Sequence, residues 1–89
     1  MEYIITFKST NFAIKSEQCL LEQKLHVSVL PLPSKIHAGC GICLRLMPDE
    51  IKAALKTLNE VHIDEIGLYS RVLDNNHYIY TEVSDRSAL

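Results

Sequence analysis

The chain has 89 residues, a formal net charge of −2 at pH 7 and an apolar fraction of 47%. This length leaves room for one domain with one core, and the apolar fraction is enough to build that core. The nine basic residues are scattered, whereas a nucleic-acid surface needs a basic stripe to neutralise phosphates. No apolar run approaches the roughly 20 residues that span a bilayer, and the first residues lack a basic signal-peptide segment. We therefore expect no nucleic-acid partner and no membrane contact.

The cysteine count indicates free thiols. A secreted disulfide scaffold of this size usually carries four or more cysteines in pairs, whereas this chain has three, Cys19, Cys40 and Cys43. Unpaired thiols are typical of a reducing compartment. We therefore expect a cytoplasmic protein with at least one thiol available for chemistry.

The first half of the chain predicts a strand, a helix and a second strand. Residues 3–7 form a short β-rich run, and Ser9 or Thr10 can then cap a helix that extends to about residue 24. The apolar residues that fit helical spacing here are Ala13, Ile14, Leu20, Leu21 and Leu25. Residues 27–32 form the second strand, and the prolines at its end predict an edge position, because proline cannot donate to a β ladder.

Residues 42–46 alternate cleanly and predict a third strand, with Ile42, Leu44 and Leu46 facing the core. The other face of the sheet is then expected to be open to water, a partner or the C-terminal segment. The side chains expected on that open face are Thr6, Cys43, Arg45, Tyr69 and Arg71.

The remaining segments predict a helix and two strands. Pro48 marks the start of a helix. Its one-sided apolar stripe consists of Ile51, Ala54, Leu55 and Leu58. Residues 66–73 form a fourth strand, residues 74–76 form a turn, and residues 78–83 form a possible fifth strand.

This order of elements predicts an α+β fold. A β-α-β-β-α-β order with both helices on one face of an antiparallel sheet is the ferredoxin-like two-layer sandwich, here with a possible fifth C-terminal strand. In that arrangement the third strand is central and the second lies at an edge. Residues 1–83 would form a single domain, and residues 84–89 would form a loose polar tail.

The turn Gly39-Cys40-Gly41 is the most informative segment for chemistry. Its glycines remove side-chain cover, permit a positive φ and allow backbone N–H groups to face the sulfur. Positive charge and N–H donors both favour the thiolate, which is the nucleophile, and Arg45 is expected near the sulfur in space. We therefore predict Cys40 as the reactive residue, supported by Gly39, Gly41, Pro33, Lys35 and His37. The plainer alternative is a tight turn with an incidental cysteine.

Two other interpretations use the same residues. Cys40 and Cys43 form a C-x-x-C pattern, which leaves Cys43 as a possible second thiol. Thioredoxin-type pairs begin a helix, however, and this pair enters a strand. His37 adds a third soft ligand at short spacing, but structural zinc usually needs a second pair of ligands. We therefore expect no metal and no cofactor. No hydrolase triad, paired carboxylates or phosphate-binding loop stands out, so a conventional hydrolase or nucleotide enzyme is unsupported.

The opening strand, the Pro-x-Pro segment at residues 31–33, the motif Ile36-x-x-Gly39-Cys40-Gly41 and the Pro48 helix resemble one known family in the same order. Over residues 1 to about 73 the chain resembles the selenium/sulfur carrier protein-like family of small bacterial proteins.

This resemblance implies that Cys40 corresponds to the family's cysteine, which carries a persulfide or selenium adduct. The implied partners are sulfur or selenium donor and acceptor proteins, and a homo-oligomer is also possible. The chain departs from the family pattern at Cys43, where a small apolar residue is expected.

A protein-interaction module that uses the open sheet face is the alternative from a different class. A carrier should lose its function on Cys40→Ser and keep its fold, whereas an interaction module should depend on Arg45 or Tyr69. Alkylation separates the thiols further. Cys40 is expected to react before Cys19, because Cys19 falls in a helix beside apolar neighbours.

Overall fold

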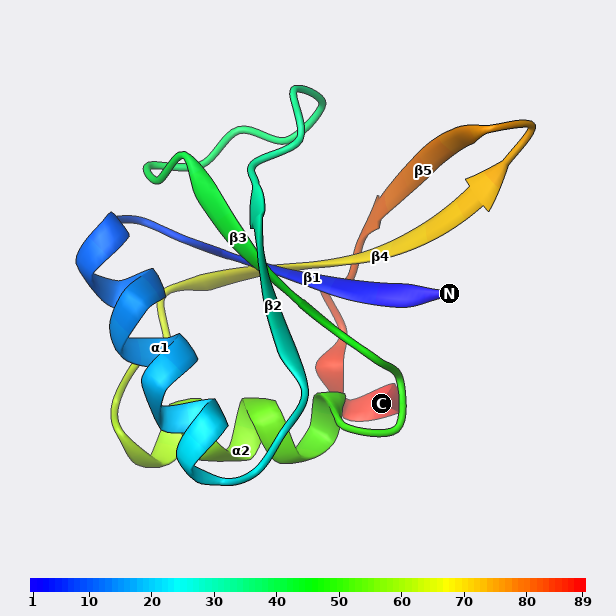
Figure 1. Ribbon diagram of the computed structural model, residues 1–89. Helices are drawn as coiled ribbons and strands as arrows, with labels where there is room; N and C mark the ends of the chain where they lie inside the picture. The colour runs from blue at the N-terminus through cyan, green and yellow to red at the C-terminus, as the bar shows by residue number, and fades with distance from the viewer.

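The computed structural model describes the backbone of residues 1–89 and every side chain except that of Ala88. Its elements in chain order are β1 (Glu2–Phe7), α1 (Thr10–Glu22), β2 (Val27–Pro31), β3 (Ile42–Leu46), α2 (Ile51–Glu60), β4 (Ile66–Asp74), β5 (His77–Glu82) and the 3₁₀ helix η1 (Arg86–Ala88). The strands form one sheet in the order β2-β3-β1-β4-β5, and every neighbouring pair is antiparallel (Figure 1).

The predicted α+β class, the antiparallel sheet and the fifth C-terminal strand are confirmed. β2 lies at an edge of the sheet, as the prolines at its end predict, and β3 lies between β2 and β1. The middle position of the five strands belongs to β1 rather than to the third strand, because β5 extends the sheet on the β4 side.

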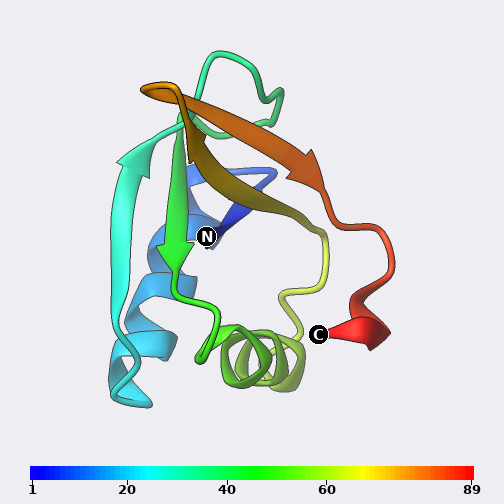
Figure 2. The same cartoon turned by 90° about the vertical axis from the view of Figure 1, so that its right-hand side faces the viewer.

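One face of the sheet shares a core with both helices. This core includes Tyr3, Ile5 and Phe7 of β1, Leu44 and Leu46 of β3, Leu68 of β4, Ala13 and Leu20 of α1, and Ile51, Ala54 and Leu58 of α2. The alternation along β1 and β3 is the period-2 pattern of a strand with one face in the core. Figure 1 shows α1 at the left and α2 below the strands, and Figure 2 shows α2 end-on.

The buried stripe of α1 is narrower than the sequence predicts. Ser9 is the N-cap, as expected, and its side chain accepts a hydrogen bond from the Phe12 N–H. Leu20 is fully buried, but Ile14 and Leu21 are 46% and 50% exposed. Ile14 and Leu21 follow Ala13 and Leu20 by one position, about 100° around a helix of 3.6 residues per turn, and so they lie outside the buried stripe.

The second sheet face, predicted to be open, is covered. Thr6, Cys43 and Arg71 on this face are buried. Ile36, from the loop between β2 and β3, packs here with Ile4 and Cys43 in a second apolar cluster, against which Tyr69 and Tyr80 are partly buried. A docking surface on an open sheet face is therefore not available in this structure.

The charges on the second face are paired. The Glu2 carboxylate accepts hydrogen bonds from Arg71 Nε at 2.9 Å and Nη2 at 2.6 Å, and it lies 3.5 Å from Arg45 Nη1. The Arg71 guanidinium also lies 3.9 Å from the centre of the Tyr78 ring. Such pairing is what allows a guanidinium to be buried at all. Arg45, which was expected near Cys40, binds Glu2 and Ser28 instead.

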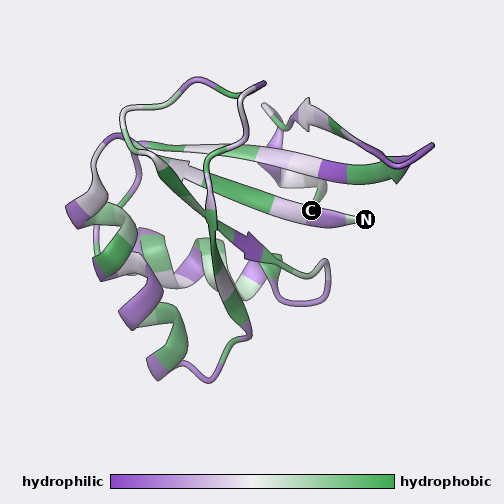
Figure 3. Ribbon diagram, turned by 45° about the horizontal axis from the view of Figure 1, so that its top comes forward, coloured by the Kyte–Doolittle hydropathy of each residue, from purple (hydrophilic) through white to green (hydrophobic). Residues whose placement is uncertain are grey.

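The β4–β5 hairpin exposes apolar side chains. Its turn residues Asn75 and Asn76 have φ values of 49° and 65°, as two-residue hairpin turns require. Figure 3 shows hydrophobic residues along the hairpin up to its hydrophilic tip. The exposed side chains are Val72, Leu73, Tyr78 and Ile79.

The C-terminal residues fold back toward the helices. The sequence predicts a loose tail over residues 84–89. In the structure Arg86 donates to the Ile66 carbonyl at 2.9 Å, and Leu89 packs against the first core. Among the described residues, no helix combines the length and apolarity needed to cross a membrane.

Candidate functional site: the Cys40 turn

Cys40 lies near the end of the loop between β2 and β3, two positions before β3 begins at Ile42. Two hydrogen bonds shape this loop, from the Leu32 N–H to the Gly41 carbonyl at 2.9 Å and from the Ile36 N–H to the Pro33 carbonyl at 3.0 Å. Ile36 is 5% exposed and anchors the loop in the second cluster. Pro33, predicted to support the Cys40 turn, thus closes a turn within this loop through its carbonyl.

Gly39 holds the turn against the end of β1. A Cβ built at Gly39 would lie 2.2 Å from the carbonyl oxygen of Lys8, so only glycine allows this approach. A Cβ at Gly41 would meet nothing within 4 Å. Neither glycine has a positive φ, so the prediction that a left-handed backbone requires these glycines is wrong. Gly39 is needed for close packing, and no such constraint acts on Gly41.

The sulfur of Cys40 has two polar contacts. The Ile42 N–H donates to Sγ over 3.4 Å, and Thr10 Oγ1 lies 3.5 Å from Sγ. Thr10 is the first residue of α1. The free N–H groups and the dipole at a helix N-terminus favour a nearby anion. The tertiary structure thus brings Cys40 to a helix start that the sequence around it does not contain.

Cys40 is buried, contrary to the sequence-based prediction of an uncovered thiol. It is only 2% exposed and belongs to the core shared with the helices, whereas Cys19 is partly exposed. The flanking glycines do remove side-chain cover, but the Cys40 side chain points inward toward α1 instead of outward. A reagent would therefore reach Cys19 first in this conformation, which reverses the expected order of alkylation.

The predicted basic neighbours lie elsewhere. Lys35 Nζ donates to the Tyr78 carbonyl at 3.2 Å and so ties the loop to β5. His37 is exposed and lines a shallow groove of about 330 Å³ beside Gly39, together with Lys8 and Tyr69. The polar contacts of the Cys40 sulfur come from Thr10 and Ile42 instead.

Cys43 belongs to the opposite side of the sheet. It is fully buried in the second cluster, and its thiol donates to the Pro31 carbonyl over 3.7 Å. Burial raises the pKa of the Cys43 thiol to about 11, against an opposing effect of the Arg71 charge. Both C-x-x-C cysteines are free and lie in different apolar clusters.

The arrangement does not gather metal ligands. No group of three or more His, Cys, Asp or Glu side chains among the described residues is placed to hold a metal ion. His37 is exposed, while Cys40 and Cys43 are buried in separate clusters.

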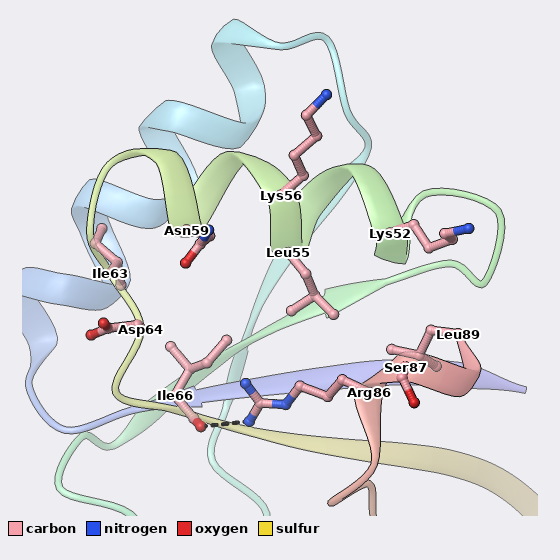
Figure 4. Close-up of a pocket in the computed structure, with 10 residues that line it drawn as sticks. All are labelled: Lys52, Leu55, Lys56, Asn59, Ile63, Asp64, Ile66, Arg86, Ser87 and Leu89. Atoms are coloured by element: carbon pink, nitrogen blue, oxygen red, sulfur yellow. Dashed lines mark hydrogen bonds between the residues drawn. The ribbon is translucent and has the colours of Figure 1, made fainter.

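A cavity of about 500 Å³ lies away from the cysteines, between α2 and the C-terminal segment (Figure 4). Figure 4 shows Leu55 and Ile66 on facing sides of this cavity and Arg86 bound to the Ile66 carbonyl. None of the predicted site residues lines it. The ten lining residues are Lys52, Leu55, Lys56, Asn59, Ile63, Asp64, Ile66, Arg86, Ser87 and Leu89.

The comparison with known families covers the segment that contains Cys40. The model of a family described as "Putative Se/S carrier protein-like" matches residues 2–70, which is most of the chain. The chain belongs to this family. The matched range contains Cys40, Thr10 and the whole loop between β2 and β3, whereas β5 and η1 lie beyond it. No curated protein and no solved structure gives a significant match.

Thr10 is the residue of this site that sequence reasoning missed. It was considered only as a helix cap, a role that Ser9 fills. Thr10 and Cys40 are 30 positions apart, so no local spacing could connect them. The family resemblance pointed to Cys40 but not to Thr10.

The two glycines of the turn should respond differently to the same substitution. Gly39→Ala forces the Cβ against the Lys8 carbonyl, so we expect a loss of about 1–3 kcal/mol in the free energy of unfolding. Gly41→Ala meets no neighbour and should change that free energy by less than about 0.5 kcal/mol. Urea denaturation of both variants measures the difference, and equal losses would contradict the close approach at Gly39.

The buried Cys43 thiol should make stability depend on alkaline pH. Its folded pKa is raised from 9.0 to about 11, so the folded protein holds this proton more tightly than the unfolded chain does. The stabilisation is therefore complete below pH 9 and is lost as the pH rises toward 11, by up to about 2 kcal/mol. Urea denaturation between these pH values should show a steeper loss for wild type than for Cys43→Ala. Parallel curves would mean that Cys43 does not keep its proton.

Proposed function

We propose that the protein is a sulfur or selenium carrier that holds a persulfide or selenium adduct on Cys40 and transfers it between partner enzymes. The observation that supports this most is the position of the Cys40 sulfur. It lies at the first turn of α1, with Thr10 Oγ1 at 3.5 Å and the Ile42 N–H at 3.4 Å. Membership of the Se/S carrier protein-like family supports the same class of function.

The transfer step needs little from the carrier beyond a positioned thiolate. The Cys40 thiolate attacks the terminal sulfur of a donor persulfide, so that a new S–S bond forms at Cys40 and the S–S bond of the donor breaks. The donor leaves as a thiolate, and the transferred sulfur keeps its proton. The acceptor then removes that sulfur by the same exchange or by its own chemistry, and the Cys40 thiolate is restored.

Cys43 is dispensable in this proposal. A neighbouring thiolate could release the sulfur of a Cys40 persulfide by closing a disulfide, which would be harmful in a carrier. Cys43 lies in the other apolar cluster, and its raised pKa keeps it protonated near neutral pH. Both features slow that side reaction.

Burial of Cys40 implies that the loop between β2 and β3 opens during transfer. The loop is held by the insertion of Ile36 into the second cluster and by the Lys35 bond to β5. In the closed form a bound persulfide would be shielded from water and from stray thiols, and a partner protein would reach it when the loop moves. Transfer would thus be coupled to contact with the partner.

The exposed apolar side chains of the β4–β5 hairpin favour contact with such partner proteins. Val72 lies opposite Ile79 and Leu73 opposite Tyr78, so each face of the hairpin exposes a pair of apolar side chains, a feature found at protein-interaction sites. Lys35 connects the same hairpin to the loop that carries Cys40. If the protein acts instead as an interaction module, this hairpin is the surface that it would use.

Two finer expectations also belong to this proposal. The shared core of both helices with one sheet face, and the order β2-β3-β1-β4, support a ferredoxin-like sandwich to which β5 is added. Three free cysteines support work in a reducing compartment such as the cytoplasm.

Sulfur loading tests the proposal. Incubation with a cysteine desulfurase and cysteine should add sulfur to wild type and to Cys43→Ser, and not to Cys40→Ser, as read by peptide mass spectrometry. A selenium donor should give the same pattern if selenium is the cargo. Equal loading of Cys40→Ser and wild type, or no loading with any donor, would contradict a carrier role and favour the interaction module.

A further inference from the structure

We infer that Thr10 is a positioning residue for Cys40, whose thiolate receives a hydrogen bond from the Thr10 hydroxyl. The inference rests on the proposed function of Cys40. It concerns the thiolate itself, however, and can be tested without any transfer assay. The observation behind it is the 3.5 Å distance between Thr10 Oγ1 and Cys40 Sγ, within hydrogen-bond range for sulfur.

The Thr10 hydroxyl is free for this contact because Ser9 already caps the helix. The Ser9 hydroxyl oxygen accepts from the Phe12 N–H at 3.4 Å, which is the normal capping bond. Thr10, at the first helical position, is not the capping residue. Its hydroxyl lies beside the sulfur, and the Ile42 N–H donates to the same sulfur at 3.4 Å.

The contact can serve both protonation states of Cys40. In the thiol form the S–H can donate to Thr10 Oγ1, whereas a thiolate can only accept. A threonine hydroxyl rotates freely, so it can turn its proton toward the sulfur when the thiol ionises. Hydrogen bonds to an ionised acceptor are stronger than those between neutral groups, so the contact favours the thiolate.

Thr10 also lies at the border between Cys40 and solvent. Thr10 is exposed, whereas Cys40 is 2% exposed. Its hydroxyl is thus a polar group that meets both the buried sulfur and the surrounding water. Near the turn lie the Cys43 thiol on β3, the Lys8–Glu65 ion pair and the exposed His37. Lys35 of the loop binds the Tyr78 carbonyl, and Arg45 of β3 pairs with Glu2.

The test compares Thr10→Val with Thr10→Ser. Valine keeps the shape of threonine and removes the hydroxyl, and serine keeps the hydroxyl. The rate of iodoacetamide alkylation at Cys40 is followed against pH, with the modified peptide identified by mass spectrometry. Thr57→Val, which removes a hydroxyl from α2, is the matched control.

Thr10→Val should move the midpoint of the Cys40 pH profile upward by about one pH unit, because a hydrogen bond to a charged group is worth about a tenfold effect. Alkylation near neutral pH should then be about tenfold slower, while the plateau rate at high pH is kept. Thr10→Ser and Thr57→Val should keep the wild-type midpoint. A merely structural role would change the plateau through loop opening and leave the midpoint in place.

An unchanged midpoint in Thr10→Val, or an equal shift in Thr10→Ser, would overturn the inference. These outcomes are separate from a failure of the carrier proposal. If Cys40 never accepts sulfur but Thr10→Val shifts the midpoint, Thr10 positions a thiolate that has another use. If Cys40 accepts sulfur and the midpoint stays, the carrier proposal stands without Thr10.

Discussion

The approach of Gly39 to the carbonyl of Lys8 is the contact on which the candidate site depends. It fixes a loop that enters β3 against the point where β1 gives way to α1, two segments about 30 residues apart in the chain. Cys40 is the residue after Gly39, and Thr10 is two positions after Lys8. The contact between Gly39 and Lys8 therefore brings Cys40 close to the first turn of α1. The neighbourhood of the sulfur is therefore set by one glycine and by the antiparallel pairing of β1 with β3.

The same pairing separates the two cysteines of the C-x-x-C pattern. Cys43 is opposite Thr6 in the β1–β3 ladder and points to the second face, whereas Cys40 precedes the strand and turns toward the helices. One thiol then has a helix N-terminus and two polar contacts. The other has an apolar cluster and a carbonyl acceptor. This division explains how a chain can keep two close cysteines without pairing them.

The sequence predicted what depends on local patterns. The alternation at β3, the prolines of β2 and the apolar stripe of α2 gave the right elements, and the family resemblance pointed to Cys40. The sequence did not predict the contacts between segments that are far apart in the chain. The folding of Ile36 and Tyr80 over the second face, the pairing of Arg45 with Glu2, and the contact of Thr10 with Cys40 each join residues with no regular spacing. The exposure of Cys40 was misjudged for the same reason, since flanking glycines say nothing about which way the side chain turns.

The state of Cys40 in the protein as isolated tests the central claim most directly. Purification without reductant and under nitrogen, followed by peptide mass spectrometry, should show an adduct of about 32 Da for sulfur or about 80 Da for selenium on the Cys40 peptide. Fragmentation of the peptide that holds both Cys40 and Cys43 should place the adduct on Cys40, and Cys19 and Cys43 should carry none. An adduct on Cys19 or Cys43 with Cys40 unmodified, or no adduct on any cysteine when the cells were grown with ample sulfur and selenite, would contradict the account.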